Sequence, residues 1–121
     1  MKIKAKSIRP FIGAKVYNTS RQFYKDLGFD EVIISHNMSI FSIENFAFYL
    51  QDYYAKDWID NTMVFLEVEN VQMHLNNLKQ SGVLEKYERV KCSKVVFNDW
   101  GNEFFLHDPS GILWHFGEFN N

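Results

Sequence analysis

The sequence predicts an α+β fold in which two βαβββ modules form one domain over residues 1–121. Two helical patterns, over residues 19–27 and 71–81, each follow one strand-like segment and precede three more. A length of 121 residues is usual for a single domain. One module alone is too small for a good core, so we expect both, about residues 8–51 and 62–118, to pack together. They should form a curved mixed sheet with a concave cleft and with the helices outside.

The first module is predicted to begin with a strand and a helix. Phe11–Val16 is an extended run, and a helical pattern follows it over residues 19–27. Thr19 or Ser20 supplies a residue type that favours a helix N-cap. Gly28 stands where a left-handed residue commonly ends a helix. The pattern therefore has both a start and a stop.

Three strands are predicted to complete the first module. β-branched residues favour strands, and the two-residue segment Glu44-Asn45 has the length of a tight hairpin turn. The polar segment Asp52–Asn61 is then expected to be a linker. The three strands are Glu31–Ser35, Ser39–Ile43 and Phe46–Gln51.

The second module repeats the order of the first, although its sequence differs. Its helix is predicted over residues 71–81, because Asn70 is an N-cap type and Gly82 ends the apolar pattern. The segment Asp108–Gly111 matches a type I turn, with Asp first, Pro second and Gly fourth, and predicts a hairpin. The strands are predicted at Met63–Val68, Lys94–Phe97, Glu103–His107 and Ile112–Phe116.

Composition limits the location and the partners of the chain. A net charge of -2 argues against nucleic acid and anionic membranes, because both need a surplus of cations. A single cysteine, Cys92, cannot form an internal disulfide. No apolar run has the length of a membrane span, and no signal-peptide pattern follows the N-terminus. We therefore expect a cytoplasmic protein.

Aromatic residues are unusually frequent. The chain has 12 Phe, 6 Tyr and 3 Trp in 121 residues. Each ring can bury on the order of 150–250 Å². So many rings predict either a core built from them or a pocket lined by them, and core packing accounts for most of them.

Two segments resemble the vicinal-oxygen-chelate superfamily, also called the glyoxalase/bleomycin-resistance superfamily. SRQFYKDLGF, residues 20–29, is similar to its first helix, and WGNEFFLHDPSGILWHFGE, residues 100–118, is similar to its last hairpin. Within the superfamily, the second segment is most similar to the bleomycin-resistance type, as is DNT at residues 60–62. The resemblance implies the same paired modules and a homodimer with ligand clefts near the subunit interface.

Enzymatic members of this superfamily bind a divalent metal on the first, fourth, fifth and eighth strands. The resemblance places the first position near Arg9 or Pro10 and the second near Leu50 or Gln51. It places the third near Met63 and the fourth at His115, and only His115 is a competent ligand. A catalytic metal needs about three protein ligands. We therefore expect no metal, no other cofactor and no catalytic residues, while a metal-dependent glyoxalase-type lyase or dioxygenase remains the alternative.

The favoured hypothesis is a metal-free protein that sequesters an aromatic or amphiphilic small molecule, such as an antibiotic, in a cleft at a dimer interface. A protein-interaction module that uses its rings as an interface is a further alternative. Strand alternation and the resemblance together give the candidate ligand-binding residues. These are Trp100, His115, Phe65, Met63, Asp60, Gln51, Met38 and Ile33.

Overall fold

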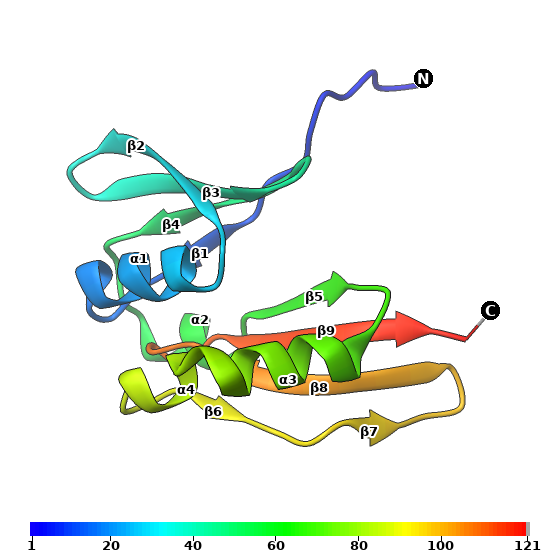
Figure 1. Cartoon of the computed structure of the whole chain (residues 1–121). Helices are drawn as coiled ribbons and strands as arrows, with labels where there is room; N and C mark the ends of the chain where they lie inside the picture. Colours follow the sequence, from blue (N-terminus) through cyan, green and yellow to red (C-terminus); the bar gives the residue numbers. More distant parts are fainter. Residues whose placement is uncertain (121) are drawn as a thin grey trace.

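The computed structural model describes residues 1–120 and confirms the α+β class, with one mixed sheet from each module (Figure 1). The N-terminal sheet has the order β1-β4-β3-β2, and the C-terminal sheet has the order β5-β9-β8-β6, with β7 also paired to β8. In each sheet the first strand lies parallel to the last strand of its module. The N-terminal sheet contains β1 (Phe11–Gly13), β2 (Asp30–Ser35), β3 (Met38–Ile43) and β4 (Phe46–Gln51). The C-terminal sheet contains β5 (Met63–Glu67), β6 (Lys91–Cys92), β7 (Val96–Phe97), β8 (Gly101–His107) and β9 (Leu113–Phe119).

The helix of the second module has the predicted ends. The helix α3 (Val71–Ser81) begins after Asn70, whose side-chain oxygen accepts a hydrogen bond from the backbone N–H of Met73 at 3.0 Å. Gly82 follows it with a φ of 81°, which is the left-handed conformation expected at a helix end. Local sequence signals therefore suffice to define this element.

Four other predicted features differ from the structure, and for two of them a tertiary contact overrides the local signal. The helix α1 (Tyr17–Asp26) starts before Thr19, since Tyr17 is buried and its hydroxyl bonds Ser39. The predicted linker contains a short helix, α2 (Lys56–Asp60), which buries Ile59 completely. A fourth helix, α4 (Val83–Lys86), follows α3. Of the predicted strand 94–97 only β7 (Val96–Phe97) is a strand, and an additional strand, β6 (Lys91–Cys92), precedes it.

The two modules share one aromatic core. Trp114 of β9 is only 2% exposed, and its ring packs against Tyr24 of α1 and against Phe29 and Phe48. Its indole Nε1 also donates a hydrogen bond to the Tyr24 hydroxyl at 3.0 Å. A residue of the last strand therefore completes the core of the first module.

The predicted turn before β9 is confirmed, and its aspartate is buried. The N–H of Gly111 donates to the carbonyl of Asp108 at 3.0 Å, which closes the four-residue turn. The Asp108 carboxylate accepts the backbone N–H groups of Ser110, Gly111 and Ile112, and also the Tyr24 hydroxyl. Burial raises the pKa of Asp108, and these hydrogen bonds oppose that effect. The turn is thereby attached to α1.

A partly buried ion pair fixes α1 on the N-terminal sheet. The guanidinium of Arg21 donates two hydrogen bonds to Glu31, at 2.6 and 3.0 Å, and Ser39 donates a third at 2.6 Å. The Glu31 side chain is 7% exposed. The Arg21 hydrogen bond is the main reason why the pKa of Glu31 lies below its ordinary value of 4.5.

We expect the stability that Glu31 contributes to depend on pH. The unfolded chain binds this proton at a higher pH than the folded chain, so the contribution is complete above pH 4.5 and is lost as pH falls below it. Urea unfolding of the Glu31→Gln variant should show a deficit of order 1 kcal/mol near neutral pH that shrinks at about pH 3.5. Glu88→Gln, at an exposed position, should show no such trend. A deficit that stays constant with pH would contradict this assignment.

None of the helices within residues 1–120 is long and apolar enough to cross a membrane.

Candidate functional site

The outer face of the C-terminal sheet is lined with rings. Because side chains alternate along a strand, Trp114 and Phe116 point to the core, and His115 between them points to the opposite face. The strand register aligns His115 with Phe65 of β5 on one side and with Phe105 of β8 on the other. Three aromatic side chains therefore lie in a row across three strands.

Two further rings extend this row into a cluster. Trp100, which precedes β8, lies with its ring centroid 6.0 Å from that of Phe65 and 5.2 Å from that of Phe119. Phe65 also contacts Phe119 at 5.7 Å and His115 at 6.0 Å. Phe65, Trp100, Phe105, His115 and Phe119 are called the ring cluster below.

The ring cluster is open to solvent in a single chain. Phe65, Trp100 and Phe119 are 44%, 38% and 50% exposed, respectively. Gly117 leaves room for the ring of Phe65, because a Cβ atom at position 117 would collide with that ring. Several large apolar side chains gathered at the surface are typical of a ligand site or an interface.

A polar pair lies within this aromatic surface. His115 Nδ1 lies 2.9 Å from Glu103 Oε1, and the other carboxylate oxygen accepts a hydrogen bond from Asn98 Nδ2 at 3.0 Å. Glu103 is 9% exposed, so its carboxylate is largely shielded from water. The C-terminal sheet therefore offers a ring surface with one oriented imidazole.

Four of the eight residues predicted for the site lie together. Met63 pairs with Leu113 in the strand register, so it extends the row that contains Phe65 and His115. Trp100 joins these residues through Phe65. Glu103, Phe105 and Phe119 belong to the same surface but were not among the eight. The alternation of β8 and β9 is the signal that would have found them.

The other four predicted residues lie elsewhere. Met38 and Gln51 are register partners on the outer face of the N-terminal sheet. Ile33 pairs with buried Ser39, so the pleat places it on the opposite face of that sheet from Met38. Asp60 lies on α2, where it forms an ion pair with Lys56 at 2.6 Å.

The outer face of the N-terminal sheet is also apolar. Phe11 stacks on Tyr49 with 4.5 Å between ring centroids and an interplanar angle of 10°. Ile40 and Val32 continue this row through the strand register. Phe11 and Val32 are 47% and 55% exposed. Each module thus presents an unburied apolar face.

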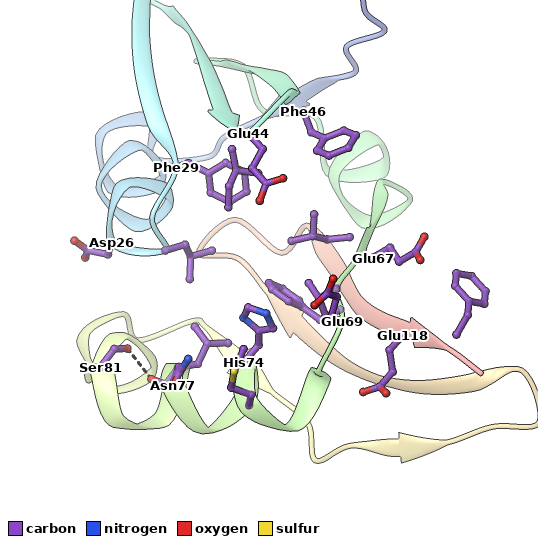
Figure 2. A pocket seen from close by; sticks show the side chains of 18 residues that line it. Asp26, Phe29, Glu44, Phe46, Glu67, Glu69, His74, Asn77, Ser81 and Glu118 are labelled. Carbon is purple, nitrogen blue, oxygen red and sulfur yellow. Dashed lines mark hydrogen bonds between the residues drawn. The ribbon is translucent and has the colours of Figure 1, made fainter. Parts of the chain in front are cut away.

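A groove of about 1210 Å³ lies between the two modules (Figure 2). Phe119, a member of the ring cluster, also lines this groove. It runs between the turns of the first module and α3, and none of the eight predicted residues lines it. The residues from 1 to 120 that line it include no lysine or arginine. Five carboxylates border its apolar floor: Asp26, Glu44, Glu67, Glu69 and Glu118.

Comparison with solved structures identifies the fold. A bleomycin-binding protein of Streptomyces verticillus, complexed with copper(II)-bleomycin, aligns with a TM-score of 0.81 at 17% identity, over 98% of this chain and 100% of that one. The chain has the bleomycin-binding fold. No protein-family model and no curated protein matches the sequence. Identity this low establishes the fold alone, and this is the fold that the resemblance in the sequence implied.

Two other solved structures mark the range of functions on this fold. TnmS3, an antibiotic-binding protein from Streptomyces sp. CB03234, aligns with a TM-score of 0.73 at 13% identity, over 99% of each chain. A lactoylglutathione lyase from Agrobacterium tumefaciens aligns with a TM-score of 0.69 at 14% identity, over 94% of each chain. The bleomycin-binding fold is therefore shared by binding proteins and an enzyme, and the site must decide between them.

Proposed function

We propose that this protein binds an aromatic or amphiphilic small molecule, such as an antibiotic, without a metal, in a cleft between two copies of the chain. The observation that supports this most is the ring cluster, which is held in place by the sheet yet left open to solvent. The similarity in fold to bleomycin-binding and antibiotic-binding proteins agrees with it.

The ring cluster suits a planar ligand. A ligand that stacks on Trp100 and Phe65 removes their exposed surface from water. Aromatic stacking adds roughly 0.5–1.5 kcal/mol per pair beyond that burial. Because the rings already contact one another, little side-chain freedom is lost on binding.

A homodimer would enclose this surface. The outer faces of both sheets expose apolar side chains, among them Phe11 and Val32 on one and Met63 and Phe65 on the other. A second chain related by a twofold axis can cover both faces, and a twofold dimer is the commonest assembly of identical chains. Sedimentation analysis should then give twice the chain mass of 14.4 kDa. A monomer at micromolar concentration would remove the dimer cleft from the proposal.

The donor atoms do not fit the metal site of the enzymatic members. Among residues 1–120, no group of three or more His, Cys, Asp or Glu side chains converges on one point. His115 and Glu103 meet, but they hydrogen-bond each other and supply only two of the roughly three ligands that catalytic zinc requires. This favours binding over metal-dependent lyase or dioxygenase chemistry. A stoichiometric divalent ion in the purified protein, lost on replacement of His115, would reverse that choice.

Calorimetric titration with bleomycin and with 2-naphthol tests the site directly. Trp100→Ala should weaken the binding of whichever probe binds by about tenfold or more, because one stacking surface is removed. Gly117→Ala should also weaken it, since the Phe65 ring must move although no ring is deleted.

Phe46→Ala is the matched control for this titration. Phe46 is 66% exposed and borders the groove between the modules, outside the ring cluster. Its replacement should leave affinity unchanged. If Phe46→Ala weakens binding and Trp100→Ala does not, the groove of Figure 2 is the site and the ring cluster is not.

A further inference from the structure

The imidazole of His115 is held by two polar side chains, Glu103 directly and Asn98 through Glu103. Asn98 Nδ2 donates to Glu103 Oε2 at 3.0 Å, and Glu103 Oε1 lies 2.9 Å from His115 Nδ1. The imidazole also contacts the ring of Phe65 at an interplanar angle of 27° and that of Phe105 at 73°. Both its hydrogen bonding and its packing therefore fix the orientation of the ring.

The hydrogen bond to Glu103 determines which nitrogen of His115 carries the hydrogen. An ionised carboxylate can only accept hydrogen bonds, so Glu103 requires a hydrogen on Nδ1. A neutral imidazole has one N–H, and its other nitrogen is an acceptor. In the neutral ring, Nε2 is therefore an acceptor and not a donor.

The acceptor nitrogen is open to solvent. Within residues 1–120, His115 Nε2 has no hydrogen-bond partner, because the only side-chain bond of this ring is at Nδ1. No buried side-chain nitrogen or oxygen in that part of the chain lacks a partner, so Nε2 must itself be accessible. An oriented, accessible acceptor thus lies in the middle of an apolar, ring-lined surface.

We propose that His115 Nε2 accepts a hydrogen bond from the ligand, so that the site selects aromatic molecules with a hydroxyl or N–H group over those with only a carbonyl or ether oxygen. Glu103 and Asn98 are the positioning residues for this selection. The inference rests on the proposed function, because it needs a ligand on the ring cluster. Selection follows because a carbonyl oxygen that faces Nε2 leaves two acceptors opposed and unpaired, which is costly once water is excluded.

The test compares 2-naphthol, which has a hydroxyl donor, with 2-acetylnaphthalene, which has only a carbonyl acceptor. Affinities for both probes are measured at the same pH, about 8. The ratio of the two affinities in the wild type is divided by that ratio in His115→Phe, so that differences in hydrophobicity between the probes cancel. We expect this quotient to favour 2-naphthol by about tenfold. A quotient near one overturns the inference.

Glu103→Gln should remove the preference. Asn98 still donates toward the same side, so the Gln oxygen must face Asn98 and the Gln amide must face His115. Nδ1 then accepts from that amide, and the hydrogen moves to Nε2, which becomes a donor. The quotient should therefore fall by about tenfold, because Nε2–H can donate both to the carbonyl of 2-acetylnaphthalene and to the hydroxyl oxygen of 2-naphthol. An unchanged quotient would show that Glu103 does not control selection.

A spectroscopic measurement keeps the inference testable without any ligand. In ¹⁵N-labelled wild-type protein, the couplings between the imidazole nitrogens and the ring protons report which nitrogen carries the hydrogen. The inference requires the Nδ1–H form in the wild type and the Nε2–H form in Glu103→Gln. An Nε2–H wild type overturns it even if both probes bind.

The outcomes separate this inference from the proposed function. If both probes bind, Trp100→Ala weakens both, and the quotient is near one, the ring cluster is a ligand site and the selection by His115 is wrong. If neither probe nor bleomycin binds, the proposed function fails, and the selection fails with it. Binding of 2-naphthol that requires an added divalent ion would assign His115 to a metal and overturn both.

Discussion

Replacing Trp114 with alanine should lower the free energy of unfolding by about 3–5 kcal/mol, the usual cost of removing a fully buried large aromatic side chain. Trp114 is 2% exposed and contacts three rings of the first module, Tyr24, Phe29 and Phe48. The cavity would therefore open where the two modules join. Loss of its indole N–H also removes a hydrogen bond to Tyr24.

Trp100→Ala is the matched control, since it deletes the same side chain from an exposed position. Trp100 is 38% exposed, so we expect a cost of about 1 kcal/mol or less. Urea denaturation followed by circular dichroism measures both variants. Because the modules share one core, Trp114→Ala should still unfold in a single transition. Equal costs for the two variants would show that Trp114 does not join the modules.

Asp108→Ala should lower the free energy of unfolding by roughly 2–4 kcal/mol, because it leaves several buried donors without an acceptor. The carboxylate accepts three backbone N–H groups of the turn and the hydroxyl of Tyr24. Asp108 and Tyr24 are both fully buried, so water cannot replace these bonds. The turn and α1 should both loosen.

Tyr24→Phe provides the control for Asp108→Ala. It removes the hydroxyl that bonds both Asp108 and Trp114, while the ring that packs in the core is kept. Tyr24→Phe should lower the free energy of unfolding by less than Asp108→Ala does. The double variant should lower it by less than the sum of the two single effects, because the two residues share a hydrogen bond. Strict additivity, measured by the same urea titrations, would contradict the coupling.

The elements that the sequence predicted correctly depend on signals between neighbouring residues. Asn70 and Gly82 define α3 because capping bonds and a left-handed residue act within one helical turn. The turn from Asp108 to Gly111 forms as predicted for the same reason. Where a distant contact intervened, prediction failed, as for α2, which forms because Ile59 is buried in the core.

Part of the candidate site was predictable in the same way. Alternation along a strand places Met63 and Phe65 on one face, and it separates His115 from Trp114. The position of Ile33 was harder to predict from the sequence, because it depends on how β2 pairs with β3 and on a register shift after Ile33. The pairing of His115 with Glu103 likewise requires the register between β8 and β9.

The sequence by itself determined the class of fold, the repeat of the two modules and the alternation of side chains along a strand, because these follow from local periodicity and turn chemistry. Only the tertiary structure decided which rings are core and which are surface. Trp100 and Trp114 are the same residue type in the same module, yet one is exposed and the other joins the modules. That difference arises from contacts between segments far apart in the chain, which no local pattern encodes.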